Sequence, residues 1–246
     1  MTEPVVVRSA TPQELADRVA AELVGTLRRV QSEGRVPAVV LTGGTIAVAI
    51  HEAVAGSPDA HLVDWSRVDV WFGDERYVPA GDPERNADQA AESLLHRLPF
   101  DPERIHAVPA SDAGHASPDE AAAAYARELR EHAPERFDVL MLGLGPDGHV
   151  ASLFPGFPQL DVDDRPAVPV TGSPKPPPER VSLTFGTLNR SREVWFVVSG
   201  EGKADAVARA LATGENAADV HEIPAVGVHG QERTVWYVDE AAASRL

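Results

Sequence analysis

Apolar residues recur at helical spacing through the first long segment of the chain. In residues 14–34, ELADRVAAELVGTLRRVQSEG, they fall three or four positions apart, as on one face of an amphipathic helix. The preceding TPQE at 11–14 forms a capping box with proline at the first helical position. The pattern predicts a helix that begins after Thr11 and ends at Gly34.

Short apolar runs alternate with further helical patterns along the rest of the chain. The runs predict strands at 35–41, 68–72, 105–109, 137–143, 181–185, 193–199, 225–229 and 234–239. Helices are predicted at 46–56, 87–97, 118–132 and 201–212, with a short helix closing the chain. The stretch GDERYVPAGDPERNA at 73–87 has the composition of a polar loop.

This alternation of strands and helices, joined by short connections, is typical of a doubly wound α/β fold. Several of the strands are apolar throughout, which favours a mostly parallel sheet with helices on both faces. The proline cluster at 174–178 is too short to separate two domains, and no internal repeat is visible. We therefore expect residues 1–246 to form a single domain around one such sheet.

Three loops of unusual composition leave the carboxyl ends of predicted strands. They are TGGT at 42–45, GDERYVP at 73–79 and GPDGHVAS at 145–152. In open α/β sheets, ligands bind beyond the carboxyl ends of the strands. The three loops are thus expected to converge on one crevice.

Charge and composition narrow the class of partner. The chain has 38 acidic and 22 basic residues, for a net charge of −16, so nucleic acid is not an expected partner. No apolar run approaches the roughly 20 residues of a membrane span, and the first residues lack the features of a signal peptide. A cytoplasmic protein that does not bind a membrane is expected. Only two lysines occur, Lys175 and Lys203, so cationic contacts to an anionic ligand must be local.

The glycines of GLGPDGHVASLFPG have two interpretations. Gly143, Gly145 and Gly148 satisfy G-x-G-x-x-G, but the dinucleotide fingerprint normally lies in the first strand–helix turn. Pro146 lacks an amide donor and Asp147 repels anions, which also disfavours a pyrophosphate site.

In the alternative interpretation, the glycines let a tight loop present Asp147 and His149 to the crevice. A carboxylate two residues from an imidazole can orient its tautomer and support general-base chemistry. The alternative is that His149 is a surface histidine on an ordinary turn, without a catalytic role.

The same stretch resembles the signature of the 6-phosphogluconolactonases, GxGxDGHxASLFPG. LTGGT, DERYVP, NADQA and PPPERVSLTFGTLN extend the resemblance over nearly the whole chain. The wider superfamily includes the glucosamine-6-phosphate deaminases, but SLFPG and the arginine of DER favour the lactonase branch. The sequence departs from the family pattern at Ala47, Arg85 and Val150, while Thr42 and Thr45 keep the hydroxyls of the usual serines.

The resemblance implies a Rossmann-like fold similar to that of the deaminases. It also implies hydrolysis of 6-phospho-D-glucono-1,5-lactone in the oxidative pentose phosphate pathway, without a cofactor. The absence of cysteine and of a G-x-S-x-G elbow favours direct attack by water over an acyl-enzyme. His149 is then the expected general base, as in the family, and Asp147 the residue that orients it.

The phosphate of such a substrate requires amide donors and positive charge. Gly43 and Gly44 open a predicted helix, whose N–H groups favour an anion, and the hydroxyls of Thr42 and Thr45 can add donors. A tight strand-to-helix turn is the alternative for this loop. Lys203, at another strand end, can contact the phosphate or remain solvated.

The DER loop supplies further candidates. Arg76 can pair with the phosphate or stabilise the oxyanion, and the sequence leaves both open. For Asp74 and its neighbour Glu75, pairing with Arg76 or with Arg85 is favoured over proton transfer.

Two more polar residues complete the predicted substrate-binding set. Asn86 can bind a sugar hydroxyl or cap the helix that follows it. Arg180, just beyond the proline cluster, is a further phosphate candidate.

No metal site is expected, because the histidines show no paired ligand spacing. The rival functions are an amino-sugar phosphate isomerase/deaminase, a non-catalytic sugar-phosphate-binding module and a nicotinamide dehydrogenase. The oligomeric state is left open, a monomer included.

Overall fold

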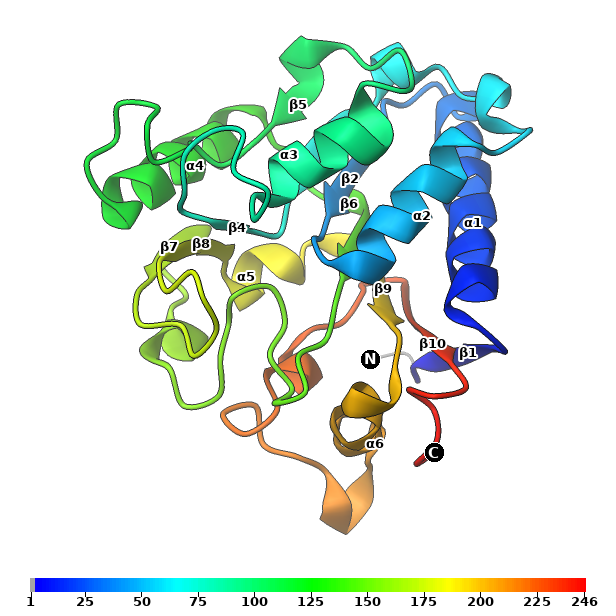
Figure 1. Ribbon diagram of the computed structural model, residues 1–246, viewed down its shortest axis with the longest axis vertical. Coiled ribbons are helices and arrows are strands. Elements are labelled where there is room, and N and C mark those ends of the chain that lie inside the picture. Colours follow the sequence, from blue (N-terminus) through cyan, green and yellow to red (C-terminus); the bar gives the residue numbers. More distant parts are fainter. Residues whose placement is uncertain (1–2) are drawn as a thin grey trace.

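The computed structural model describes residues 3–246, and its centre is a seven-stranded parallel sheet (Figure 1). The strand order is β1-β10-β9-β6-β2-β3-β5, and each neighbouring pair is parallel. The strands are β1 Val5–Ser9, β2 Ala38–Leu41, β3 Asp69–Phe72, β5 Ile105–His106, β6 Phe137–Leu142, β9 Ser191–Val198 and β10 Arg233–Asp239. The predicted mostly parallel sheet is confirmed.

Helices cover both faces of this sheet, as predicted. They are α1 Pro12–Ser32, α2 Thr45–Ala55, α3 Asn86–Ala90, α4 Pro118–His132, α5 Phe185–Leu188 and α6 Ala204–Leu211. Because side chains alternate along a strand, successive residues of β2 and β3 enter different cores. Val39 and Val70 pack with α1 and α2, whereas Val40 and Trp71 pack with α4 on the other face.

The predicted capping box of α1 is confirmed, and the first turn of α4 is capped in a similar way. The Thr11 hydroxyl accepts a hydrogen bond from the N–H of Glu14 at 3.1 Å, and the Glu14 carboxylate accepts one from the N–H of Ala10 at 2.9 Å. The Ser117 hydroxyl accepts from the N–H of Glu120 at 3.3 Å. Such caps satisfy N–H groups that the first turn of a helix leaves without partners.

A second, antiparallel sheet is the main addition to the predicted architecture. It has the order β4-β8-β7, formed by Asp74–Arg76, Arg180–Leu183 and Ala167–Val170. The prediction that 73–87 is a polar loop is therefore wrong at its start, because Asp74–Arg76 pairs with β8. The chain passes between the sheets at Gly73, whose N–H donates to Leu41 in β2 and whose carbonyl accepts from Leu183 in β8.

Two further predictions are wrong near the end of the chain. Residues 225–229 do not form a strand: Pro224–Gly227 is a turn of 3₁₀ helix, and the N–H of Ala225 donates to the carbonyl of Gly148. No closing helix forms over 240–245, which make turns capped by Asp239 through the N–H groups of Ala242 and Ala243. At 225–229 the contact with the distant glycine loop outweighs the local pattern.

Among residues 3–246, no helix is both long and apolar enough to cross a membrane.

Candidate active site

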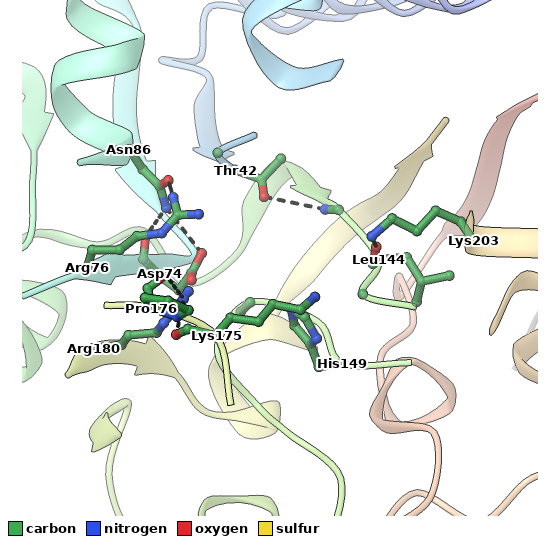
Figure 2. Close-up of a pocket in the computed structure, with 14 residues that line it drawn as sticks. Thr42, Asp74, Arg76, Asn86, Leu144, His149, Lys175, Pro176, Arg180 and Lys203 are labelled. Carbon is green, nitrogen blue, oxygen red and sulfur yellow. Dashed lines mark hydrogen bonds between the residues drawn. The ribbon is translucent and has the colours of Figure 1, made fainter. Parts of the chain in front are cut away.

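The three loops that follow β2, β3 and β6 meet at the carboxyl edge of the parallel sheet, as predicted. They enclose a cavity of about 230 Å³ (Figure 2). The residues that line it are Thr42, Gly43, Asp74, Arg76, Asn86, Gly143, Leu144, Gly145, His149, Ala151, Lys175, Pro176, Arg180 and Lys203.

The glycine loop is shaped around its histidine. The N–H of Gly145 donates to the carbonyl of His149, and the N–H of Gly148 donates to the carbonyl of Gly145, both at 2.9 Å. Gly148 has φ +84°, a conformation that favours glycine. At Gly145 a Cβ atom would lie 1.9 Å from Nδ1 of His149, so only glycine leaves room for the imidazole. These contacts explain why glycine occupies positions 145 and 148, and no bound nucleotide is needed to explain it.

His149 and Asp147 form a close pair beside the cavity. His149 Nδ1 lies 2.5 Å from Asp147 Oδ1, which leaves Nε2 as the other ring nitrogen available to a ligand. Burial raises the pKa of Asp147, but the hydrogen bond and charge of His149 outweigh it and lower that pKa to about 2. The His149 ring also packs against Phe154 with centroids 4.5 Å apart. The imidazole is thus held from two sides, with its tautomer set by a carboxylate.

Positive charge gathers around this pair. Arg76, Lys175, Arg180 and Lys203 line the cavity with a single carboxylate, Asp74, in a chain whose net charge is −16. Figure 2 shows Arg76 and Arg180 on one side and Lys203 on the other. A concave site of one sign concentrates ligands of the opposite sign. The cavity is therefore suited to an anion.

Both lysines of the sequence lie in this cavity. Lys203 Nζ donates to the carbonyl of Leu144 at 2.6 Å, and burial together with the charge of Lys175 lowers its pKa. Burial also lowers the pKa of Lys175, which lies in the proline cluster and was not predicted as a site residue. The scarcity of lysine in the sequence was the one signal that could have identified Lys175.

Arg180 holds the proline segment in place. Its Nε donates to the carbonyl of Pro177, and its Nη2 to the carbonyls of Lys175 and Pro176. Its guanidinium also lies over the Phe154 ring at 5.8 Å. Arg180 thus lines the predicted site, but several of its donors position the backbone that carries Lys175.

Arg76, Asn86 and Asp74 form a connected group on the wall opposite Lys203 (Figure 2). Arg76 Nη1 donates to Asn86 Oδ1, and Asn86 Nδ2 donates to the carbonyl of Asp74 at 2.9 Å. The Asp74 carboxylate accepts from the Ser152 hydroxyl at 2.6 Å rather than pairing with Arg76 or Arg85. Asn86 does not cap α3, since its amide is committed to this group.

The TGGT loop divides between two cavities. Thr42 lines the cavity described above, Gly44 and Thr45 line an adjoining one of about 400 Å³, and Gly43 lines both. Gly43 faces the Arg76–Asn86 group so closely that a Cβ there would lie 1.8 Å from Asn86 Oδ1. Lys203 lines both cavities.

The described residues contain no group of three or more acidic or histidine side chains arranged to hold a metal ion.

Comparison with known proteins identifies the family of the chain. Residues 10–236 match the family of glucosamine-6-phosphate isomerases/6-phosphogluconolactonase. The chain belongs to this family. A 6-phosphogluconolactonase of Streptomyces coelicolor is 47% identical over 99% of this chain and 95% of its own length. One of Mycobacterium tuberculosis is 43% identical over 85% of this chain and 84% of its own.

Solved structures of the family share the fold. The 6-phosphogluconolactonase of Thermotoga maritima superposes with a TM-score of 0.82 at 29% identity, over 96% of this chain and 99% of that one. That of Trypanosoma brucei gives a TM-score of 0.86 at 26% identity, with all of both chains covered. A monomeric glucosamine-6-phosphate deaminase, 19% identical over 98% of this chain, shares the fold with a TM-score of 0.78.

Proposed function

We propose that the chain hydrolyses 6-phospho-D-glucono-1,5-lactone to 6-phosphogluconate, in the oxidative pentose phosphate pathway and in the cytoplasm. The observation that carries this proposal is the cavity itself, where a carboxylate-held imidazole is surrounded by four cations in an acidic chain. An anionic ester that needs a general base fits both features. The naming of the curated relatives as 6-phosphogluconolactonases supports the same reaction.

In the proposed reaction, water attacks the lactone carbonyl and His149 Nε2 accepts its proton. Asp147 keeps the proton of the neutral ring on Nδ1, which leaves Nε2 basic, and stabilises the imidazolium that forms. When the tetrahedral intermediate collapses, the bond from the carbonyl carbon to the ring oxygen breaks. The imidazolium then returns its proton to that oxygen, which becomes the C5 hydroxyl of the product.

Lys175 and Lys203 are proposed to hold the phosphate. Each is partly buried, and the charge of Lys175 lowers the pKa of Lys203, so a bound dianion relieves the repulsion between them. Arg76 either binds the phosphate or stabilises the oxyanion, and the kinetics of Arg76→Met distinguish these two roles. A rise in KM alone marks phosphate binding, whereas a fall in kcat marks oxyanion stabilisation.

We also propose that residues 1–246 act as one domain. The cavity takes Arg76 from β4 and Arg180 from β8 in the small sheet, and Gly143 and His149 from the loop after β6. Neither sheet alone carries a complete site.

The test is catalysed lactone hydrolysis by the wild type and by His149→Ala together. Glucose-6-phosphate dehydrogenase generates the lactone in situ, and acceleration over the spontaneous rate is measured. We expect acceleration by the wild type and a loss of about 10²–10⁴-fold in the variant. Near-normal turnover by a folded His149→Ala protein would exclude this mechanism. Ammonia release from glucosamine 6-phosphate without lactone hydrolysis would instead identify a deaminase.

A further inference from the structure

Glu75 is a buried carboxylate beside the cavity that the proposed reaction does not use. It is fully buried and lies in β4 between Asp74 and Arg76, both of which line the cavity. Because successive side chains of a strand point to opposite faces, Glu75 points away from the cavity and into the protein. A buried charge is costly unless it has several partners.

Those partners tie together two segments that carry site residues. Glu75 Oε1 accepts from the backbone N–H groups of Arg76 at 2.8 Å and of Asn86 at 2.7 Å, and Oε2 accepts from Ala87 at 2.9 Å. Asn86 and Ala87 begin α3, whose N-cap residue Arg85 makes no side-chain cap. Glu75 therefore supplies the missing cap from β4 and closes the loop of 77–85 at its base.

The same three hydrogen bonds set the geometry of one wall of the cavity. The backbone of Arg76 and the backbone of Asn86 are both fixed by Glu75, and their side chains then meet as Arg76 Nη1 to Asn86 Oδ1. Gly43 packs against this pair with no room for a methyl group. A small displacement at the base of the loop would thus move the guanidinium that faces the ligand.

Opposing effects act on the pKa of Glu75. Burial raises its pKa to about 7, against the opposing effects of Arg85, whose Nη2 lies 4.0 Å away, and of the backbone N–H groups. Its charge also acts on Tyr125 in α4 and on Arg180 in β8, in each case raising the pKa of that group. Hydrogen bonds to an ionised acceptor are about twice as strong as neutral ones, and a protonated carboxyl turns an O–H toward N–H donors.

We propose that Glu75 is a positioning residue whose ionised carboxylate fixes Arg76 and Asn86 for binding of the lactone, so that order at this wall increases from mildly acidic to mildly alkaline pH. The choice of ligand rests on the lactone hydrolysis proposed above. Glu75 touches no substrate and acts only through the two residues that it holds.

The test compares Glu75→Gln, which imitates the protonated carboxyl, with Glu92→Gln, an exposed control on the continuation of α3. At about pH 8 we expect Glu75→Gln to raise KM about tenfold, the effect of one charge-assisted hydrogen bond, with a much smaller change in kcat. The substrate phosphate takes up a proton near pH 6, so both KM values should rise from about pH 8 to pH 6, but that of the wild type should rise more steeply than that of Glu75→Gln. Glu92→Gln should behave as the wild type.

Melting temperature separates positioning from a merely structural role. The native state binds the proton of Glu75 more tightly than the unfolded state does, so the ionised group costs stability above about pH 7. Glu75→Gln should therefore melt at or above the wild-type temperature at about pH 8. A variant that melts at a lower temperature, with a lower kcat as well as a higher KM, would overturn the proposal. So would a folded variant with the KM and the pH dependence of the wild type.

Amide hydrogen exchange of the wild type keeps the proposal testable if Glu75→Gln does not fold. In local opening of 77–90, Glu75 stays buried but loses the N–H donors that lower its pKa, so protonation favours this opening, unlike global unfolding. Corrected for the intrinsic rate, exchange in 77–90 should therefore slow about tenfold or less from about pH 6 to pH 8, while exchange in α4 stays constant. Unchanged protection of 77–90 would overturn the proposal. This measurement needs no substrate, so a wild type that fails to hydrolyse the lactone would refute the proposed function and leave the exchange result to decide the role of Glu75.

Discussion

Replacing Asp147 by asparagine is expected to lower kcat while leaving the fold intact. The amide of the new side chain can donate to Nδ1 of His149, which would place the ring proton on Nε2, the nitrogen that must accept a proton from water. The charge that stabilises the imidazolium is lost as well. Both changes act on the chemical step, so KM should change much less than kcat.

The size of the effect follows from the interaction between the two side chains. Against burial, the hydrogen bond and charge of His149 lower the pKa of Asp147 from 3.8 to about 2. Each pKa unit corresponds to about 1.4 kcal/mol, and because the Asp147 side chain is 34% exposed, solvent screening reduces the total to about 1–2 kcal/mol. This energy corresponds to a decrease in kcat of roughly 5–30-fold. The unfavourable tautomer lowers kcat further, up to the 10²–10⁴-fold expected for complete loss of general-base catalysis.

The assay follows formation of 6-phosphogluconate with 6-phosphogluconate dehydrogenase, after subtraction of spontaneous hydrolysis. Asp161→Asn is the matched control, since Asp161 lies 3.4 Å from His221 in an exposed pair and does not line the cavity. Circular dichroism confirms folding of each variant. A folded Asp147→Asn protein with wild-type kcat would refute the orienting role of this carboxylate.

Three further predictions follow from the structure. Gly43→Ala should raise KM about tenfold, because its Cβ would lie 1.8 Å from Asn86 Oδ1, while Gly25→Ala, with open space, should not; steady-state kinetics compare them. Lys203→Met should raise KM about 10–100-fold with a smaller change in kcat, and an unchanged KM would contradict phosphate binding. Burial lowers the pKa of His51 to about 4, so the native state keeps it neutral and its contribution to stability falls as pH drops from about 6.5 to 4. In urea unfolding, the wild type should therefore lose about 2 kcal/mol relative to His51→Leu between about pH 7 and pH 5, and equal pH dependence of the two proteins would contradict this.

The sequence by itself determined the elements whose signals are local. The Thr11 and Ser117 caps act within four residues, and the apolar runs of β2, β3 and β6 mark strands that are buried on both faces. The loop around His149 could also be predicted from the sequence, because Gly145 and Gly148 make hydrogen bonds within the same loop and Gly145 leaves room for its histidine. Convergence of the three loops also followed from the sequence, since parallel strands end at one edge.

Tertiary structure alone decided the features that join distant segments. β4 was read as loop because its three residues are too few to show a period, and its partner β8 lies about a hundred residues further on. The same pairing places Arg180 where it draws the proline segment and Lys175 toward the cavity. Nor could the sequence indicate that Glu75 caps a helix eleven residues away, because that bond depends on the position of β4 in the fold and not on a local pattern. Caps and hydrophobic periodicity depend on residues close together in the sequence, so they can be recognised from it. Pairings between distant segments depend on how the two cores pack, which no local pattern records.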